Sequence, residues 1–112
     1  MPHQNSINEL LDIRKHCQDI IEFTSGMTLQ DYLGDKMVRR AVERTLIIIG
    51  VAAVQVRDGD PDIFESMETL RPAIGVRNRL AHGYDDLVSD EAIWTIVKEG
   101  IPTLIAEIES KM

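Results

Sequence analysis

The sequence predicts an all-α protein: a single domain over residues 1–112, built as an antiparallel bundle of four to five helices. Three observations predict this fold. Apolar residues recur every three to four positions along most of the chain, which is the spacing of amphipathic helices. No stretch alternates apolar and polar residues for long enough to indicate a strand. Capping residues, glycines and prolines divide the chain into helical lengths with short connections.

The first helix is expected over residues 6–24, where charged residues separate apolar ones at helical spacing. Ser6 is suited to cap its start, and a Ser-Gly pair follows its end. Thr28 and Asp31 have the spacing of a capping box, although with a shorter acid than usual. They predict a turn or short helix over residues 29–33.

A long helix is expected from about residue 35 to 56. Apolar side chains surround its second half, and a helix that is apolar on every side is normally buried on every side. Because a small monomer offers few such places, we expect a self-association surface there. Residues 58–62 (DGDPD) have the composition of a turn, and a short helix over 63–70 should follow.

Two more helices complete the bundle. Pro72 is expected in the first turn of one helix, which should end at Gly83 because glycine suits the left-handed C-cap position. Ser89 or Asp90 should cap the last helix. Pro102 lies within its apolar pattern and should kink or divide it.

Composition excludes several classes of function. The chain has 12 Lys and Arg residues against 19 Asp and Glu residues, a net charge of −7, which argues against a nucleic-acid coat but not against a small basic site. A single cysteine, Cys17, excludes an internal disulfide and a Cys-based zinc site. The longest apolar run, 46–54, is shorter than the ~20 residues of a membrane helix, and no signal peptide is visible. We therefore expect a cytoplasmic protein without a membrane partner.

Residues 71–84 (RPAIGVRNRLAHGY) form the unusual segment of this acidic chain. Residues 71–82 contain three of the 12 basic residues of the chain and one of its three histidines. At about 100° per residue, a helix places Asn78 and His82 on one stripe, whereas Arg77 and His82 are about 140° apart. Arg77 and His82 should therefore meet only where the helix ends, or where a second chain completes the pair.

These residue types suit the cleavage of RNA. Histidine exchanges a proton near neutral pH, so it can activate a ribose 2′-hydroxyl or protonate the leaving oxygen. Arginine can hold a phosphate and stabilise the charge of the transition state. The sequence shows no convincing metal-ligand cluster and predicts no cofactor. One such histidine per chain is a single acid–base group, and a two-fold dimer would supply a second.

A structural interpretation of the same residues stays open. A histidine in the last turn of a helix is favoured by the helix dipole, and Arg77 or Arg79 could pair with nearby carboxylates. The basic residues near the start of the long helix could form a solvated face or contact phosphates. The candidate RNA contacts are Arg71, Arg79, Lys36, Arg39 and Arg40.

Residues 77–84 match the pattern of an arginine, four residues, a histidine, one residue and a tyrosine. This pattern resembles the motif of the HepT-like toxins of the HEPN superfamily. Segments 41–53 (AVERTLIIIGVAA) and 92–104 (AIWTIVKEGIPTL) are similar to the long helix and the final helix of that family. The resemblance spans nearly the whole chain. One departure is Val51, where many relatives carry an acidic residue.

The resemblance implies a dimeric, metal-independent ribonuclease that is the toxin of a type II/VII-like toxin–antitoxin pair. Its partner would be a minimal nucleotidyltransferase antitoxin, and its substrate tRNA or mRNA. Arg77 and His82 would be catalytic in a cleft at the homodimer interface, and Asn78 would orient the motif. Tyr84 would receive AMP from the partner. The added bulk and negative charge beside the cleft would silence the enzyme.

Two other functions are compatible with the sequence. The chain could be a non-catalytic binding or substrate subunit of a nucleotidyltransferase complex, in which the motif is an interface feature. It could also be a structural bundle without that partner. Toxicity on expression separates the ribonuclease from the binding subunit, and a stable complex with a nucleotidyltransferase excludes the structural bundle.

Overall fold

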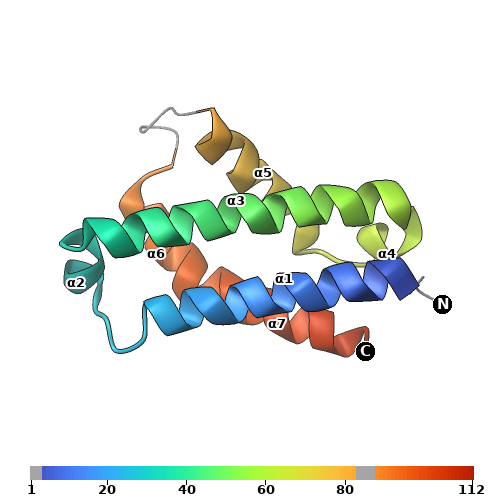
Figure 1. Cartoon of the computed structure of the whole chain (residues 1–112), viewed down its shortest axis with the longest axis horizontal. Helices are drawn as coiled ribbons and strands as arrows, with labels where there is room; N and C mark the ends of the chain where they lie inside the picture. Colours follow the sequence, from blue (N-terminus) through green and yellow to red (C-terminus); the bar gives the residue numbers. More distant parts are fainter. Residues whose placement is uncertain (1–3, 83–87) are drawn as a thin grey trace.

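The computed structural model describes residues 4–82 and 88–112, and within these ranges the chain is helical without a strand, as predicted. The molecule measures 44 × 29 × 18 Å. Two long helices, α1 (Gln4–Phe23) and α3 (Lys36–Gly59), lie side by side along its longest axis (Figure 1). The remaining helices pack on this pair.

The connection from α1 to α3 contains the short helix α2 (Leu29–Leu33), whose bounds are those expected. The predicted capping box is present: the Thr28 hydroxyl accepts from the Asp31 backbone N–H at 3.1 Å, and Asp31 accepts from the Thr28 N–H at 3.0 Å. Gly26 turns the chain before it with a φ of 75°, a conformation that favours glycine.

The turn predicted over 58–62 is wrong in extent, because α3 continues to Gly59 and only Asp60 separates it from α4 (Pro61–Glu65). A residue before proline is kept out of the helical region, and Asp60 has a φ of −149° and a ψ of 74°. Its carboxylate accepts from the Ile63 N–H at 3.3 Å and from the Ser6 hydroxyl at 2.8 Å. One residue therefore ends α3, caps α4 and ties both to α1.

The helix expected over 63–70 is also wrong in extent. The α4 helix ends at Glu65, where the Ser66 hydroxyl donates to the Ile63 carbonyl at 2.7 Å. Helix α5 (Leu70–Ala81) then begins two residues before Pro72, which lies in its first turn as expected. Its C-cap is His82, so the helix ends before Gly83, which lies outside the described residues.

The C-terminal segment is divided as Pro102 predicts. Ser89 caps α6 (Asp90–Thr95), accepting from the Ala92 N–H at 3.1 Å. A π-helical segment, η1 (Ile96–Gly100), follows and leads into α7 (Ile101–Ser110), where Pro102 occupies the first turn. Proline lacks the N–H that a continuous α-helix would use there, and a wider π-turn accommodates the change.

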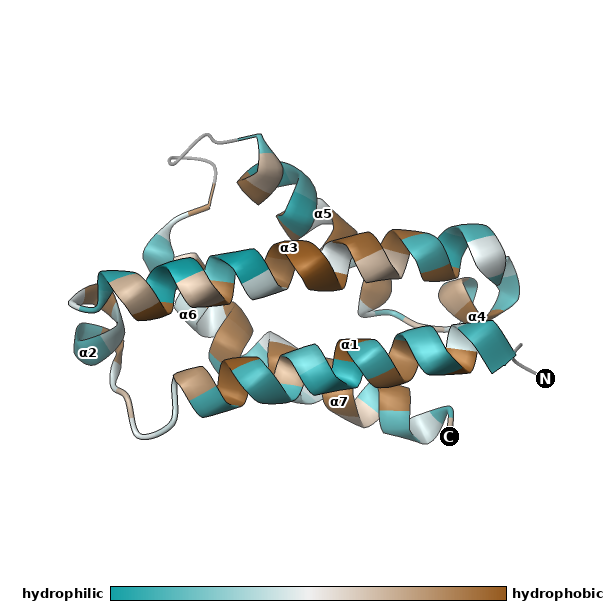
Figure 2. Ribbon diagram, viewed as in Figure 1, coloured by the Kyte–Doolittle hydropathy of each residue, from teal (hydrophilic) through white to brown (hydrophobic). Residues whose placement is uncertain are grey.

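The core lies where α1, α3, α5 and α7 meet, and α3 is its central element. The middle of α3 is its most apolar part (Figure 2). Its buried residues include Val42, Ile49 and Val56, whereas Val51 is 40% exposed. The second half of α3 is thus largely covered within one chain, and self-association through it stays a prediction. Within the described ranges, no helix is both long and apolar enough to cross a bilayer.

Candidate active site

Helix α5 carries the predicted motif, and its start is fixed by a side chain from another helix. Thr69 is the N-cap, but its hydroxyl does not cap the helix and instead donates to Glu107 of α7 at 2.6 Å. The Glu107 carboxylate also accepts from the backbone N–H groups of Glu68 and Thr69, each at 3.0 Å. Burial acts to raise the pKa of Glu107, but these hydrogen bonds and nearby Lys111 outweigh it, so the pKa is lowered.

The inner face of α5 packs on α3. Leu70 and Ile74 are buried, and one turn further Arg77 is half-buried, with its Cβ and Cγ against Gly50 in the middle of α3. The helix then leaves the α1–α3 pair, as Figure 1 shows. Arg77 therefore lies where α5 leaves the core, with its stem inside the fold.

The guanidinium of Arg77 is directed along α5 toward the next residue. Its Nη1 donates to Asn78 Oδ1 at 3.0 Å, and its Nε is buried without a hydrogen-bond partner among the described residues. Asn78 is exposed. This bond holds one edge of the guanidinium at the solvent-facing side of the helix, where a phosphate could reach it.

His82 lies at the end of α5 and is exposed. On an ideal helix it is about 40° from Asn78 and about 140° from Arg77. The Arg77–Asn78 hydrogen bond partly closes this angle, because Asn78 lies between the other two residues around the helix. The predicted catalytic residues thus share one helix end, with Asn78 linking the arginine to the histidine side.

The other basic residues differ in their surroundings. Arg79 is exposed on α5, while Arg71 forms an exposed ion pair with Glu65 at 2.9 Å. Arg39 donates to the Tyr32 and Leu33 carbonyls at the end of α2.

Two of the candidate RNA contacts at the start of α3 form ion pairs. Arg39 also pairs with Asp90 at 3.7 Å, so it joins α2, α3 and α6. Arg40 pairs with Glu43 at 3.0 Å, and Lys36 is exposed at the start of α3. RNA contact by any of these side chains stays a prediction, and Arg39 is the one most engaged within the fold.

Tyr84, the predicted modification site, lies outside the described residues. Within residues 4–82 and 88–112 no group of three or more His, Cys, Asp or Glu side chains is arranged to hold a metal ion. Cys17 is buried, and this burial raises the pKa of its thiol to about 12.

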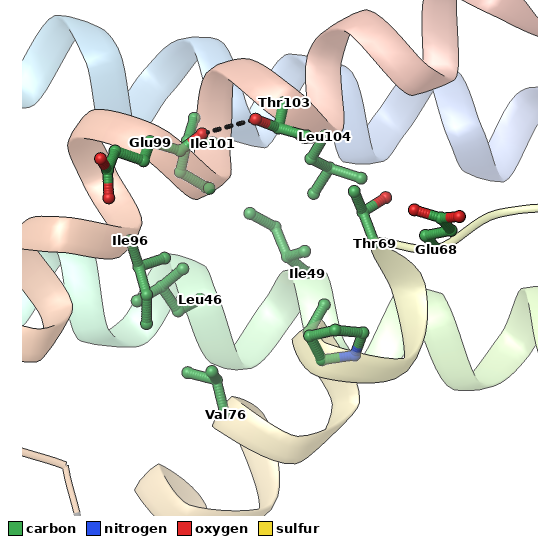
Figure 3. A pocket seen from close by; sticks show the side chains of 13 residues that line it. Leu46, Ile49, Glu68, Thr69, Val76, Ile96, Glu99, Ile101, Thr103 and Leu104 are labelled. Atoms are coloured by element: carbon green, nitrogen blue, oxygen red, sulfur yellow. Dashed lines mark hydrogen bonds between the residues drawn. The ribbon is translucent and has the colours of Figure 1, made fainter.

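An apolar groove of about 410 Å³ lies beside the motif helix, between α3, α5 and the η1–α7 segment (Figure 3). Leu46, Ile49, Val76, Ile96 and Leu104 line it, with Thr69 and Glu68 near one end. None of the motif side chains Arg77, Asn78 and His82 lines this groove. Its lining includes the carboxylates of Glu68 and Glu99 but no histidine or arginine, so the groove is separate from the predicted catalytic residues.

The sequence singled out the motif residues as candidates but gave no indication of two residues that contact their helix. In the sequence Gly50 is only a glycine within a long helix. Glycine destabilises a helix interior, so its presence there suggests close packing against a neighbour without naming that neighbour. Glu107 gave no local signal, because its partners are 38 and 39 positions away in the chain.

Comparisons with known proteins identify the family of this chain. The model of the family described as "Ribonuclease HepT-like" matches residues 13–110. A Methanocaldococcus jannaschii protein named "Putative RNase" is 34% identical over 100 residues, covering 89% of this chain and 90% of that protein. A second protein of that organism with this description is 36% identical over 112 residues, covering 97% and 88%.

A relative from Thermococcus cleftensis, named "Probable ribonuclease HepT", is 34% identical over 103 residues, covering 89% of each chain. No solved structure gives a significant match. The fold and the matches define a helical protein of a ribonuclease class. The chain belongs to the HepT-like ribonuclease family of the HEPN superfamily.

Proposed function

We propose that this protein is a metal-independent endoribonuclease that cleaves tRNA or mRNA as a homodimer. The observation that carries the proposal is the arrangement in the last turns of α5, where Arg77 donates to Asn78 and His82, about 40° round an ideal helix from Asn78, is the C-cap. Family membership gives RNA as the substrate class. The side chains at this helix end supply the two kinds of chemistry that the reaction needs.

In the proposed reaction a base removes the proton of the ribose 2′-hydroxyl, and the oxygen attacks the adjacent phosphorus. The bond from phosphorus to the 5′-oxygen breaks, and an acid protonates that oxygen. The products are a 2′,3′-cyclic phosphate and a 5′-hydroxyl. His82 acts as the acid or base, and Arg77 stabilises the charge that grows on the phosphoryl oxygens.

The dimer follows from the number of groups required. Each chain brings one histidine at this helix end, whereas the reaction needs a base and an acid. A two-fold axis near the end of α5 would place two copies of Arg77 and His82 in one cleft. The net charge of −7 then requires that RNA contacts concentrate there, and exposed Arg79 is the candidate next to the motif.

A mixing experiment tests this composite cleft. Purified Arg77→Ala and His82→Ala proteins should each fold and fail to cleave RNA. Wild-type protein that exchanges subunits with excess His82→Ala forms heterodimers whose cleft retains one histidine instead of two, so cleavage per wild-type chain should fall. Cleavage that stays in proportion to the number of wild-type chains, in a mixture that contains heterodimers, would contradict a shared cleft.

The biological role that fits this activity is that of a cytoplasmic toxin paired with a minimal nucleotidyltransferase. The partner would transfer AMP from ATP to the hydroxyl of Tyr84, two residues after His82, and release pyrophosphate. The added phosphate would repel RNA beside the cleft. Tyr84→Phe should keep cleaving RNA after incubation with the partner and ATP, while the wild type should gain AMP mass and lose activity.

If the unmodified wild-type protein is folded and harmless on expression, the alternative applies. The chain would then be a non-catalytic binding or substrate subunit of the nucleotidyltransferase.

A further inference from the structure

Helices α3 and α5 pack closely at a glycine of α3. Gly50 is buried in the middle of α3. A Cβ built there would overlap the Cβ of Arg77 and lie 2.7 Å from its Cγ and 3.0 Å from the Ala73 carbonyl oxygen. Two of these atoms belong to the stem of the predicted catalytic arginine, and the third is backbone of the same helix. Any side chain at position 50 therefore displaces α5, Arg77 or both.

Other helical glycines in the described residues show that this contact is particular to Gly50. A Cβ at Gly75, on the motif helix itself, would have no atom within 4 Å, and the same holds for Gly59 near the end of α3. A Cβ at Gly100 would make only ordinary contact with Ile96. Helix geometry alone thus does not demand a glycine at position 50, whereas the packing of Arg77 does.

We propose that Gly50 is a positioning residue for Arg77, an inference that rests on the proposed role of Arg77 in cleavage. The absence of a side chain on Gly50 lets the Arg77 stem lie against the α3 backbone, which buries Nε and leaves Nη1 to meet Asn78. A methyl group at position 50 pushes the stem outward. The guanidinium then leaves the place where the Arg77–Asn78 hydrogen bond holds it.

Gly50→Ala and Gly75→Ala form a matched pair, because both replace a helical glycine with the best helix former. Gly50→Ala should lower kcat per folded molecule by about 10²-fold, as expected when a catalytic group moves by roughly 1 Å. Gly75→Ala should keep the wild-type kcat.

A spectroscopic measurement separates this inference from the proposed function. The Nε–Hε resonance of Arg77 in a ¹H–¹⁵N spectrum reports the position of the stem whether or not the protein cleaves RNA. It should shift and exchange faster with water in Gly50→Ala and stay unchanged in Gly75→Ala. A folded Gly50→Ala protein with the wild-type resonance and kcat would overturn the assignment. If the wild type does not cleave RNA, the proposed function fails while this resonance still decides the contact.

If Gly50→Ala does not fold, a compensating second substitution tests whether the collision with Arg77 is the cause. Arg77→Gly removes the colliding Cβ and Cγ, whereas Arg77→Ala keeps the Cβ. The double variant Gly50→Ala/Arg77→Gly should fold, and Gly50→Ala/Arg77→Ala should not. Equal behaviour of the two double variants would overturn the inference.

Discussion

The carboxylate of Glu107 stabilises the start of the motif helix, and its replacement by glutamine measures that contribution. The carboxylate accepts three hydrogen bonds, from the Glu68 N–H, the Thr69 N–H and the Thr69 hydroxyl. In Glu107→Gln one of the two oxygens becomes an NH₂ group. The new NH₂ group therefore faces at least one of these N–H or O–H donors and cannot accept from it. The negative charge near the start of α5 is also lost.

The magnitude follows from the kind of bond. A hydrogen bond to a charged group contributes about 1.5–3 kcal/mol to stability, and partial exposure of Glu107 lets water replace part of it. We therefore expect Glu107→Gln to lower the free energy of unfolding by about 1 kcal/mol, within the range for a lost helix cap. For a domain of this size that lowers Tm by roughly 4 °C.

The pH dependence gives a second check on this bond. The pKa of Glu107 is lowered in the folded state, so its contribution is complete above the unfolded pKa of about 4.3 and is lost as pH falls through the lower folded pKa. The difference in stability between the wild type and Glu107→Gln should be constant from neutral pH to about pH 5. It should close as the pH is lowered further.

Thermal unfolding followed by circular dichroism supplies the measurement, with Glu109→Gln as the control. Glu109 lies on the same helix and is exposed, and its side chain makes no hydrogen bond with the described residues. The control should change stability by less than about 0.5 kcal/mol. Equal Tm values for the two variants at neutral pH would refute the assignment of Glu107 as the cap of α5.

Three further results are expected. Because Cys17 is buried and its thiol pKa is raised to about 12, a thiol reagent should label it only as fast as the protein unfolds; rapid labelling of the folded protein would contradict this. Asp60→Ala should lower the free energy of unfolding by about 2 kcal/mol, since it removes bonds joining α1 and α4, while Asp62→Ala at an exposed site should change it little in urea titration. Arg39→Ala should destabilise the fold more than Arg40→Ala, whose exposed ion pair contributes about 0.5 kcal/mol; the reverse order in Tm would argue against a structural role for Arg39.

Local signals predicted much of the fold. The Thr28–Asp31 capping box, the Ser89 cap and the division near Pro102 were predictable because each depends on residues a few positions apart. The turn over 58–62 was predicted too broadly, because turn-forming residues are tolerated in the last turn of a helix. Only Asp60 is outside the helices. The following Pro61 keeps its backbone out of the helical region, and its carboxylate accepts a buried hydrogen bond from Ser6 of α1.

In the candidate site, too, local features were predictable and contacts between helices were not. Arg77 and His82 were candidates from residue chemistry and from the family resemblance, and their divergence on a helix was predicted from their spacing. The Asn78 bond that partly closes that divergence depends on a side-chain rotamer, which the sequence does not specify. Gly50 and Glu107 contact α5 from other helices, so their roles emerge only once the chain is folded.

Cleavage of total tRNA by the purified, unmodified protein in EDTA tests the central claim most directly, with His82→Ala prepared in parallel. Intact mass establishes first that Tyr84 carries no AMP, and circular dichroism establishes that both proteins are folded. The account predicts that the wild type cleaves tRNA in EDTA and leaves 2′,3′-cyclic phosphate ends, while His82→Ala leaves the RNA intact. A folded, unmodified wild type that leaves tRNA and mRNA intact, or equal cleavage by His82→Ala, would contradict it.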